Sequence, residues 1–284
     1  MTAEVYTDVQ QREILRVVPE LIRYRRLLLD LVWKEIRARY RNAMMGLFWA
    51  VLQPLLMTVI LTFVFTIFLG MSGRGALAGQ RPFAVVFLCA FIPWQFFSLA
   101  LTLATASLIM DANLVKKVHF PREAIPLASV GNVMVNLFIG FLLLIVVLAW
   151  FRQPIGIGLA WTPLILAVQI VLVVGLALFF SCLNVFYRDV AFMLDAVLTF
   201  GFYASPVIYP LDFVTKRFPA DSFWYKAYML NPMAGLLSSY REAILENRLP
   251  GLELMGWPIC AAAIALAAGV IVFRRFSPYF ADHL

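Results

Sequence analysis

Two short polar segments hold the side chains that are best placed to act on something outside the chain. Residues 184–190 put Tyr187, Arg188 and Asp189 in a charged turn between two apolar runs. Residues 205–210 hold two prolines, which interrupt the next apolar helix before it is complete. A charged turn before a broken apolar helix suits a membrane protein that receives a push from a soluble partner and opens a path through lipid.

The sequence contains no nucleotide-binding loop and no metal-binding motif. None of its fifteen glycines is followed by Lys, so the Gly-x-x-x-x-Gly-Lys-Ser/Thr loop that cradles nucleotide phosphates is absent. Cys89, Cys182 and Cys260 lie in apolar runs without neighbouring metal ligands. The apolar runs also lack the paired charges expected of a proton-coupled transporter. If this protein pumps, a separate polypeptide must hydrolyse the nucleotide.

A second charged segment, residues 111–123, mixes basic with apolar side chains. Leu114, Val118 and Phe120 cost free energy in water unless lipid or protein covers them, and Pro121 ends one helix before the next run begins. A short helix that crosses the ends of two spans and docks against a soluble domain would explain them. A plain connector resting at the membrane surface would also do so.

Polar residues recur at helical spacing inside the third long apolar run. Ser129, Asn132, Asn136 and Gly140 fall three or four positions apart, which places them on one face of a helix. Amides are costly in lipid, so this face must meet either another helix or a wet cavity. Both alternatives also apply to Gln53-Pro54 and to four positions of the fourth run, namely Gln169, Gly175, Ser181 and Asn184.

These segments must be positioned by membrane-spanning helices. The chain is 63% hydrophobic and only 14% charged, and a helix needs about 20 apolar residues to cross a bilayer. Six runs approach or exceed this length, and one of them, residues 190–211, carries Asp195 near its start. We therefore predict an all-α integral membrane protein with six transmembrane helices, at residues 42–73, 82–110, 124–151, 153–187, 254–273 and 190–211.

Lys and Arg are concentrated on one side of the predicted membrane. They gather before the first run, at 116–122, at Arg188, and at Arg274 and Arg275. The positive-inside rule therefore places both termini in the cytoplasm. The net charge of +7 follows from this topology, so nucleic acid need not be invoked as a partner. Residues 1–26 contain no apolar core of a cleavable signal peptide.

Two further elements flank the spans. Before the first run, Pro19 can open a helix in which apolar and basic residues alternate at helical spacing, which indicates an amphipathic interface helix or, alternatively, an ordinary basic flank. We assign residues 1–41 to a cytoplasmic tail with this helix and residues 42–284 to the transmembrane domain.

Residues 212–240 are rich in aromatic side chains and end in an uncharged run, 227–240. This run is too short to cross a bilayer, which predicts a re-entrant or interfacial helix at the outer surface. Their aromatic rings suit either a membrane-interface belt or a sugar path.

Several motifs, taken in order along the chain, resemble those of the permease subunit of type-two ABC exporters. They are Trp49-Ala50 with Gln53-Pro54, residues 114–118 with 120–123, residues 184–190, residues 205–210, and Asn231-Pro232 followed by Tyr240-Arg241. The resemblance extends over residues 27–284 and is strongest to the polysaccharide-exporting branch of that family.

The resemblance implies a homodimer that pairs with two copies of a separate ABC ATPase subunit. That partner would carry ATP and Mg, so no cofactor is expected in this chain. The family has a cytoplasmic coupling helix between the second and third spans and short outer re-entrant helices. Its members reside in the cytoplasmic (inner) membrane, in contact with membrane lipid, and export lipid-linked polysaccharide such as O-antigen or capsule. The alternatives are a permease for teichoic acid or small molecules, and a membrane enzyme acting on lipid-linked sugars.

The resemblance also suggests roles for individual residues. ATPase coupling is expected at Leu114, Lys116, Lys117, Val118, Phe120, Arg122, Glu123, Tyr187, Arg188 and Asp189. Cations near the cytoplasmic entrance suit a pyrophosphate-linked lipid head. Arg37, Arg39 and Arg41 are therefore expected at the lipid head, although topology alone also explains them. Asn132, Asn136, Tyr203 and Tyr209 are expected along the substrate path.

The topology can be tested by cysteine labelling. Single cysteines at Gly75, Gln153 and Asp221 should react with a membrane-impermeant thiol reagent in intact cells whose outer membrane, if present, is permeabilised. A cysteine at Lys117 should not react, because the basic residues hold that segment in the cytoplasm. Labelling at Lys117 would overturn the orientation.

Overall fold

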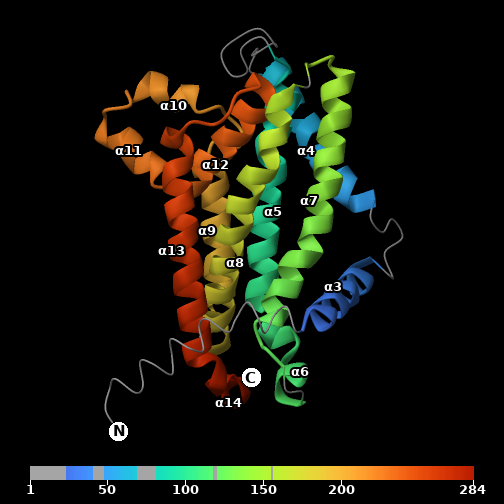
Figure 1. Ribbon diagram of the computed structural model, residues 1–284. Coiled ribbons are helices and arrows are strands. Elements are labelled where there is room, and N and C mark those ends of the chain that lie inside the picture. Colours follow the sequence, from blue (N-terminus) through green and yellow to red (C-terminus); the bar gives the residue numbers. More distant parts are fainter. Residues whose placement is uncertain (1–23, 41–47, 69–80, 118–119, 155) are drawn as a thin grey trace.

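The computed structural model describes residues 24–40, 48–68, 81–117, 120–154 and 156–284. Within these ranges the chain is helical and forms no strand. Most of the helices run side by side as an upright bundle (Figure 1). The all-α architecture expected from the apolar runs is therefore confirmed.

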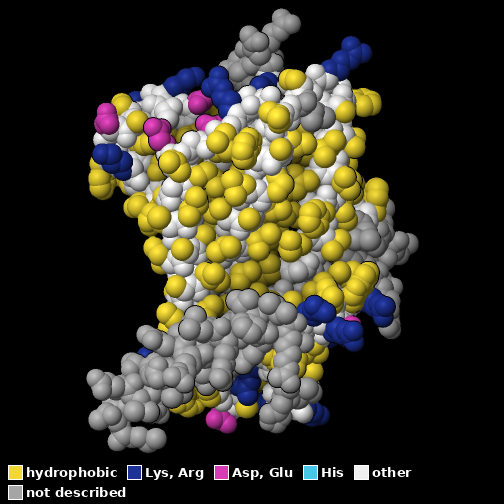
Figure 2. All heavy atoms as spheres, in the orientation of Figure 1, with side chains coloured by type: hydrophobic (Ala, Val, Ile, Leu, Met, Phe, Trp, Pro, Cys, Tyr) yellow, Lys and Arg dark blue, Asp and Glu magenta, His cyan; other side chains and the backbone are white. Residues whose placement is uncertain are grey.

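Five helices of the described chain are long and apolar enough to cross a membrane. Figure 2 shows the result as a broad hydrophobic band, with charged side chains gathered towards the two ends of the molecule. The five are α4 (Phe48–Phe63) with the π-helical η1 (Val64–Phe68), α5 (Phe83–Met110), α7 (Ala124–Trp150), η2 (Ile157–Trp161) with α8 (Thr162–Phe186), and α13 (Leu252–Phe276) with η4 (Ser277–Tyr279) and α14 (Phe280–His283).

The remaining predicted span is shorter than expected. Helix α9 (Val190–Ala204) has 15 residues and ends at Ser205, directly before Pro206. It is apolar and packs beside α5 and α8 (Figure 1). Because a crossing takes about 20 helical residues, the count of six spans stays a prediction, whereas the helix break at the Ser205-Pro206 step is confirmed.

Helix α5 forms the centre of the bundle. It packs against α4, α7, α8, α9 and α12 (Pro232–Arg241), and most of its side chains from Phe83 to Leu108 are buried. Its apolar residues surround the whole helix rather than one face, as expected for a helix enclosed on all sides. The walls around α5 therefore decide where any path through the protein can lie.

Helices α8 and α13 approach closely because glycines face each other at their contact. A Cβ on Gly269 would lie 2.1 Å from the carbonyl oxygen of Gly175, and one on Gly175 would lie 2.3 Å from the amide nitrogen of Leu266. Small residues allow this approach where apolar side chains gain nothing by leaving lipid. Gly175, for which packing and a cavity were both open, is therefore a packing residue.

Polar side chains inside the bundle bridge its helices. The amide of Gln169 donates to Pro93 O at 2.8 Å and accepts from the Tyr240 hydroxyl at 2.8 Å. Asn184 donates to Thr105 O at 3.0 Å and accepts from the backbone N–H of Ala191 at 3.2 Å. Of the two alternatives for the polar positions in the fourth run, helix packing is therefore confirmed for Gln169 and Asn184, and a wet cavity is not needed to explain them.

The predicted helix over residues 227–240 is wrong in its boundaries. The structure has α10 (Asp212–Arg217), a partly exposed α11 (Phe223–Met229) and a buried α12, with a turn at Leu230 and Asn231. The Asn231 side chain caps α12 by accepting from Met233 N at 3.0 Å, and Pro232 occupies its first turn. The Asn-Pro step therefore starts a new helix. The chain then continues through η3 (Glu242–Glu246) into α13.

A buried arginine fixes the break after α9. Arg241 donates to the carbonyl oxygens of Pro206 at 2.5 Å, Val207 at 2.7 Å and Tyr209 at 3.0 Å. It also donates to Val86 O of α5 at 3.1 Å. The proline break frees carbonyl groups that an intact helix would have paired, and a buried unpaired carbonyl is costly. The guanidinium supplies the missing donors and joins α5, α9 and α12.

The two ends of the bundle carry different elements. Helices α3 (Arg25–Tyr40), α6 (Ala112–Lys117) and α14 lie at one end, which we call the α6 end, while α10 and α11 lie at the other (Figure 1). Helix α3 packs on α7 through Leu31, which is buried with Ala124 and Ala128. Pro19, the expected start of the amphipathic helix, lies outside the described residues.

The glycine contact predicts a sharp difference between two alanine substitutions in α13. Gly269→Ala places a methyl group against backbone atoms of α8 and should destabilise the protein by about 1–3 kcal/mol. Gly256→Ala meets nothing within 4 Å and should be neutral or slightly stabilising. Thermal unfolding in detergent, followed by size-exclusion chromatography, measures both. Equal melting temperatures for the two variants would contradict the glycine packing.

Candidate functional site

The α6 helix has basic side chains outside and apolar ones inside. Lys116 and Lys117 are exposed, while Val115 is 4% exposed and packs in a cluster with Phe280. Leu114 and Phe120 are partly buried, and both pack against this cluster and against the cluster of Leu31, Ala124 and Ala128. These two apolar side chains are therefore at least partly covered by the chain itself. Val118 lies outside the described residues.

Arg122 and Glu123 hold the C-terminal segment. The guanidinium of Arg122 donates to Ser277 O and lies 5.9 Å above the centre of the Phe280 ring. The Glu123 carboxylate pairs with Arg274 at 3.2 Å, with both side chains largely buried. In this structure, these two predicted coupling residues brace the start of α7 against α13 and the C-terminal segment. Their contact with an ATPase stays a prediction.

The predicted second contact is an exposed turn. Tyr187, Arg188 and Asp189 are all exposed between α8 and α9. The buried amide of Asn184 fixes this turn, because it donates to Thr105 O of α5 and accepts from Ala191 N at the start of α9. A rigid exposed turn at the α6 end can transmit a displacement to α9.

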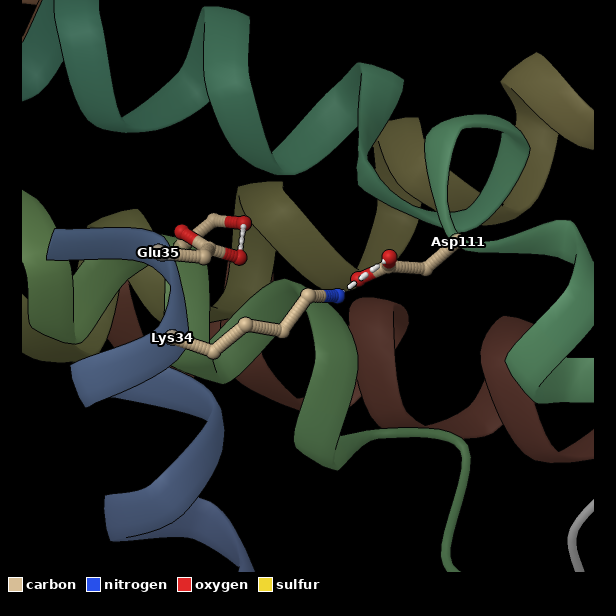
Figure 3. A network of polar contacts seen from close by, with 4 residues as sticks. Lys34, Glu35 and Asp111 are labelled. Atoms are coloured by element: carbon tan, nitrogen blue, oxygen red, sulfur yellow. Dashed lines mark hydrogen bonds and ion pairs between the residues drawn. The ribbon is translucent and has the colours of Figure 1, made fainter. Parts of the chain in front are cut away.

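Helix α3 is tied to both α6 and α7 at adjacent positions (Figure 3). The ammonium of Lys34 lies 2.5 Å from a carboxylate oxygen of Asp111, at the start of the α6 turn. The Glu35 carboxylate accepts from the Ser129 hydroxyl at 2.8 Å and from the Asn132 amide at 3.4 Å. The polar stripe of α7 therefore meets another helix, at least for Ser129 and Asn132.

A cavity of about 610 Å³ opens between α4, α5 and α9. Its polar lining comes from amides, hydroxyls and a carboxylate, and its apolar lining includes four aromatic rings. The lining residues in the described chain are Gln53, Met57, Phe91, Trp94, Gln95, Ser98, Leu99, Thr102, Asp195, Leu198, Thr199, Phe202 and Tyr203.

Contacts among the lining residues fix the positions of several polar and aromatic side chains in this cavity. The Thr102 hydroxyl donates to a carboxylate oxygen of Asp195 at 3.0 Å, which links α5 to α9. Phe202 lies edge-on to both Phe91 and Trp94, with ring centres 6.3 and 6.1 Å away. Fixed rings beside hydrogen-bonding groups suit a sugar, which presents both hydroxyls and apolar C–H faces.

The residues predicted for a substrate path lie in different places. Tyr203 lines the cavity between α4, α5 and α9, and Tyr209 lines a second, mainly apolar cavity of about 720 Å³ beside α10 and α11. Asn132 is buried against Glu35 and lines neither cavity, so its assignment to the path stays a prediction. Asn136 lies in a small crevice with Gln95.

The three arginines predicted for the lipid head belong to the N-terminal region. Arg37 is exposed on α3. Arg39 lies on the same helix, but its side chain and the whole of Arg41 lie outside the described residues. Arg37 lines neither of the two larger cavities of the described chain, and the role of all three arginines at the lipid head stays a prediction.

The sequence prediction missed most of the cavity lining, although a signal was present. Gln95, Ser98 and Thr102 recur three and four positions apart in α5, and Asp195 and Thr199 do so in α9. The periodicity that indicated the α7 stripe would have found them. It could not have said which stripe meets a helix and which lines a cavity.

Comparison with known proteins places the whole chain in context. The sequence model of the family described as "ABC-2 type transporter" matches residues 26–245. A protein of Myxococcus xanthus named "O-antigen export system permease protein RfbA" is 27% identical over 272 residues, covering 95% of this chain and 100% of the relative. Two Klebsiella pneumoniae proteins of the same name are 30% and 29% identical, each covering 91% of this chain and 95% of the relative.

The Glu35 contact predicts a pH-dependent stability. Burial raises the pKa of the Glu35 carboxyl, although hydrogen bonds from Ser129 and Asn132 oppose the rise. The folded state then binds this proton more tightly than the unfolded state. The contribution of Glu35 to stability is therefore fully present below the unfolded value of about pH 4.5 and is lost as pH rises through the raised pKa. Glu35→Gln should flatten this part of the profile, as measured by melting temperature against pH.

Asp30, exposed on the same helix, provides the control. Asp30→Asn should keep the wild-type dependence of melting temperature on pH. A constant difference between wild type and Glu35→Gln across this range would show that the carboxyl does not titrate in its buried contact.

Proposed function

Because the chain belongs to the ABC-2 type transporter family, we propose that it is the membrane permease subunit of an ATP-driven exporter of lipid-linked polysaccharide. An O-antigen type of glycan is favoured, because the relatives that match over nearly their whole length carry that name. The protein acts as a transport subunit and performs no covalent step on its cargo.

The observation that carries this proposal is the mixed lining of the cavity between α4, α5 and α9. Asp195 is exposed on α9 between Phe192 and Phe200, which are 77% and 74% exposed. A carboxylate on this face is costly in hydrocarbon, which favours contact with water or a polar cargo there. The facing wall of α5 provides one amide, two hydroxyls and two aromatic rings, which are groups that a glycan needs.

The energy comes from a partner. Two copies of a separate ABC ATPase bind ATP and Mg²⁺ and press on the α6 end of a permease homodimer. Lys116, Lys117 and the turn of Tyr187, Arg188 and Asp189 are exposed there and available for contact. The basic residues of this end favour a cytoplasmic location for it, with both termini on that side of the inner membrane.

Filling the cavity should stop export without preventing assembly. Thr199→Trp places a large ring in the cavity, and we expect surface polysaccharide to fall at least about tenfold in a strain whose own permease is deleted. The ATPase should still co-purify, because the α6 end is unchanged. Polysaccharide gels and affinity purification measure the two effects.

Phe200→Trp is the matched control, because it puts the same ring at the neighbouring position of α9, outside the cavity lining. It should export at close to the wild-type level. Normal export by Thr199→Trp would refute the proposed path.

A further inference from the structure

We infer that Asp195 makes the cavity selective for uncharged sugar residues and against anionic ones. The inference rests on the proposed function, because it assigns a charge class to the glycan that the cavity passes. It separates two kinds of cargo that the family resemblance leaves open. One is a glycan of neutral sugars, and the other is a polyanion built from uronic acids or phosphodiesters.

The first argument is the charge balance of the cavity. Asp195 is the one charged side chain among the described residues that line it, and its polar neighbours are neutral amides and hydroxyls. Two like charges a few ångströms apart repel strongly where protein and lipid keep the effective dielectric constant low. A carboxylate or phosphate on the cargo would meet this repulsion without a compensating cation in the described lining.

The second argument is the location of the cations. One group of cations, Lys34, Lys116 and Lys117, lies on α3 and α6 at the α6 end of the bundle. Arg217 lines the other cavity, beside α10 and α11. The cavity between α4, α5 and α9 therefore differs from both ends of the protein in its charge, which indicates that it is adapted to a different part of the cargo than the phosphate of a lipid head.

The third argument is the geometry around the carboxylate. Thr102 donates to one oxygen of Asp195 at 3.0 Å and so restrains the group against α5. The same cavity presents the rings of Trp94, Phe202 and Tyr203. A carboxylate accepts hydrogen bonds from neighbouring hydroxyls of a sugar, while an aromatic face covers the C–H groups of the same ring. Both contacts suit an uncharged pyranose.

The experiment compares two cargos that differ in one group. Both are synthetic prenyl-pyrophosphate-linked oligosaccharides, one with glucose in each repeat and the other with glucuronate at the same positions. The permease–ATPase complex is reconstituted in vesicles, and ATP-dependent translocation of each cargo is measured. Wild type should move the glucose form at least about tenfold faster.

The Asp195 variants turn the selectivity into a residue-specific readout. Asp195→Asn keeps the shape of the side chain and should bring the ratio of the two rates close to one, mainly by speeding the glucuronate form. Asp195→Lys should reverse the preference. Asp221→Asn, an exposed change beyond α10, should keep the wild-type ratio. A smaller fraction of folded complex would slow both cargos by the same factor. The ratio of the two rates therefore reports on selectivity and is independent of folding yield.

Each outcome bears on the inference. Equal rates for the two cargos in wild type, or an unchanged ratio in Asp195→Asn, would overturn the charge selectivity while leaving the proposed export function intact. Failure of the wild-type complex to move either cargo would count against the proposed function itself, and the inference would fail with it.

Discussion

The guanidinium of Arg241 joins three parts of this protein at the point where helix α9 ends. A proline break inside an apolar bundle leaves carbonyl groups without their helical partners, and such groups are costly when buried. Arg241 donates to three of them, at Pro206, Val207 and Tyr209, and to Val86 of the central helix. The broken end of α9 is thereby held to α5 and α12. The cavity depends on this clamp, because α5 and α9 form two of its walls.

The α6 end is braced by interactions of a different kind. The exposed pair Lys34 and Asp111 is screened by water and contributes little on its own. The pair Glu123 and Arg274 is largely buried, so breaking it by removing one partner would leave a costly unpaired charge. Together with the contact of Arg122 to the C-terminal segment, these bonds tie the residues that flank α6 on both sides to α3 and α13. In the proposed function, a push on α6 therefore moves several helices as a unit.

Between these two ends, the cavity combines a carboxylate with ordered aromatic rings, which a helix that faces only lipid would not need. Lipid excludes a carboxylate, and water alone does not need a wall of ordered rings. Asp195 and Thr102 share the cavity with Trp94 and Phe202, which suits a cargo that is both hydroxylated and apolar on its faces. The names of the relatives and the chemistry of the cavity wall favour the same class of cargo, one through overall sequence similarity and the other through the groups that line the wall.

The sequence alone determined the long apolar helices, the break at Pro206 and the absence of a phosphate loop, because each follows from composition or from the local geometry of one residue type. It also indicated the polar stripe of Ser129 and Asn132. Only the tertiary structure decided that this stripe meets Glu35, that Ser98 faces a cavity, and that Arg241 closes the break. Helical periodicity specifies which residues share a face, whereas the neighbour of that face is set by how helices distant in sequence pack together.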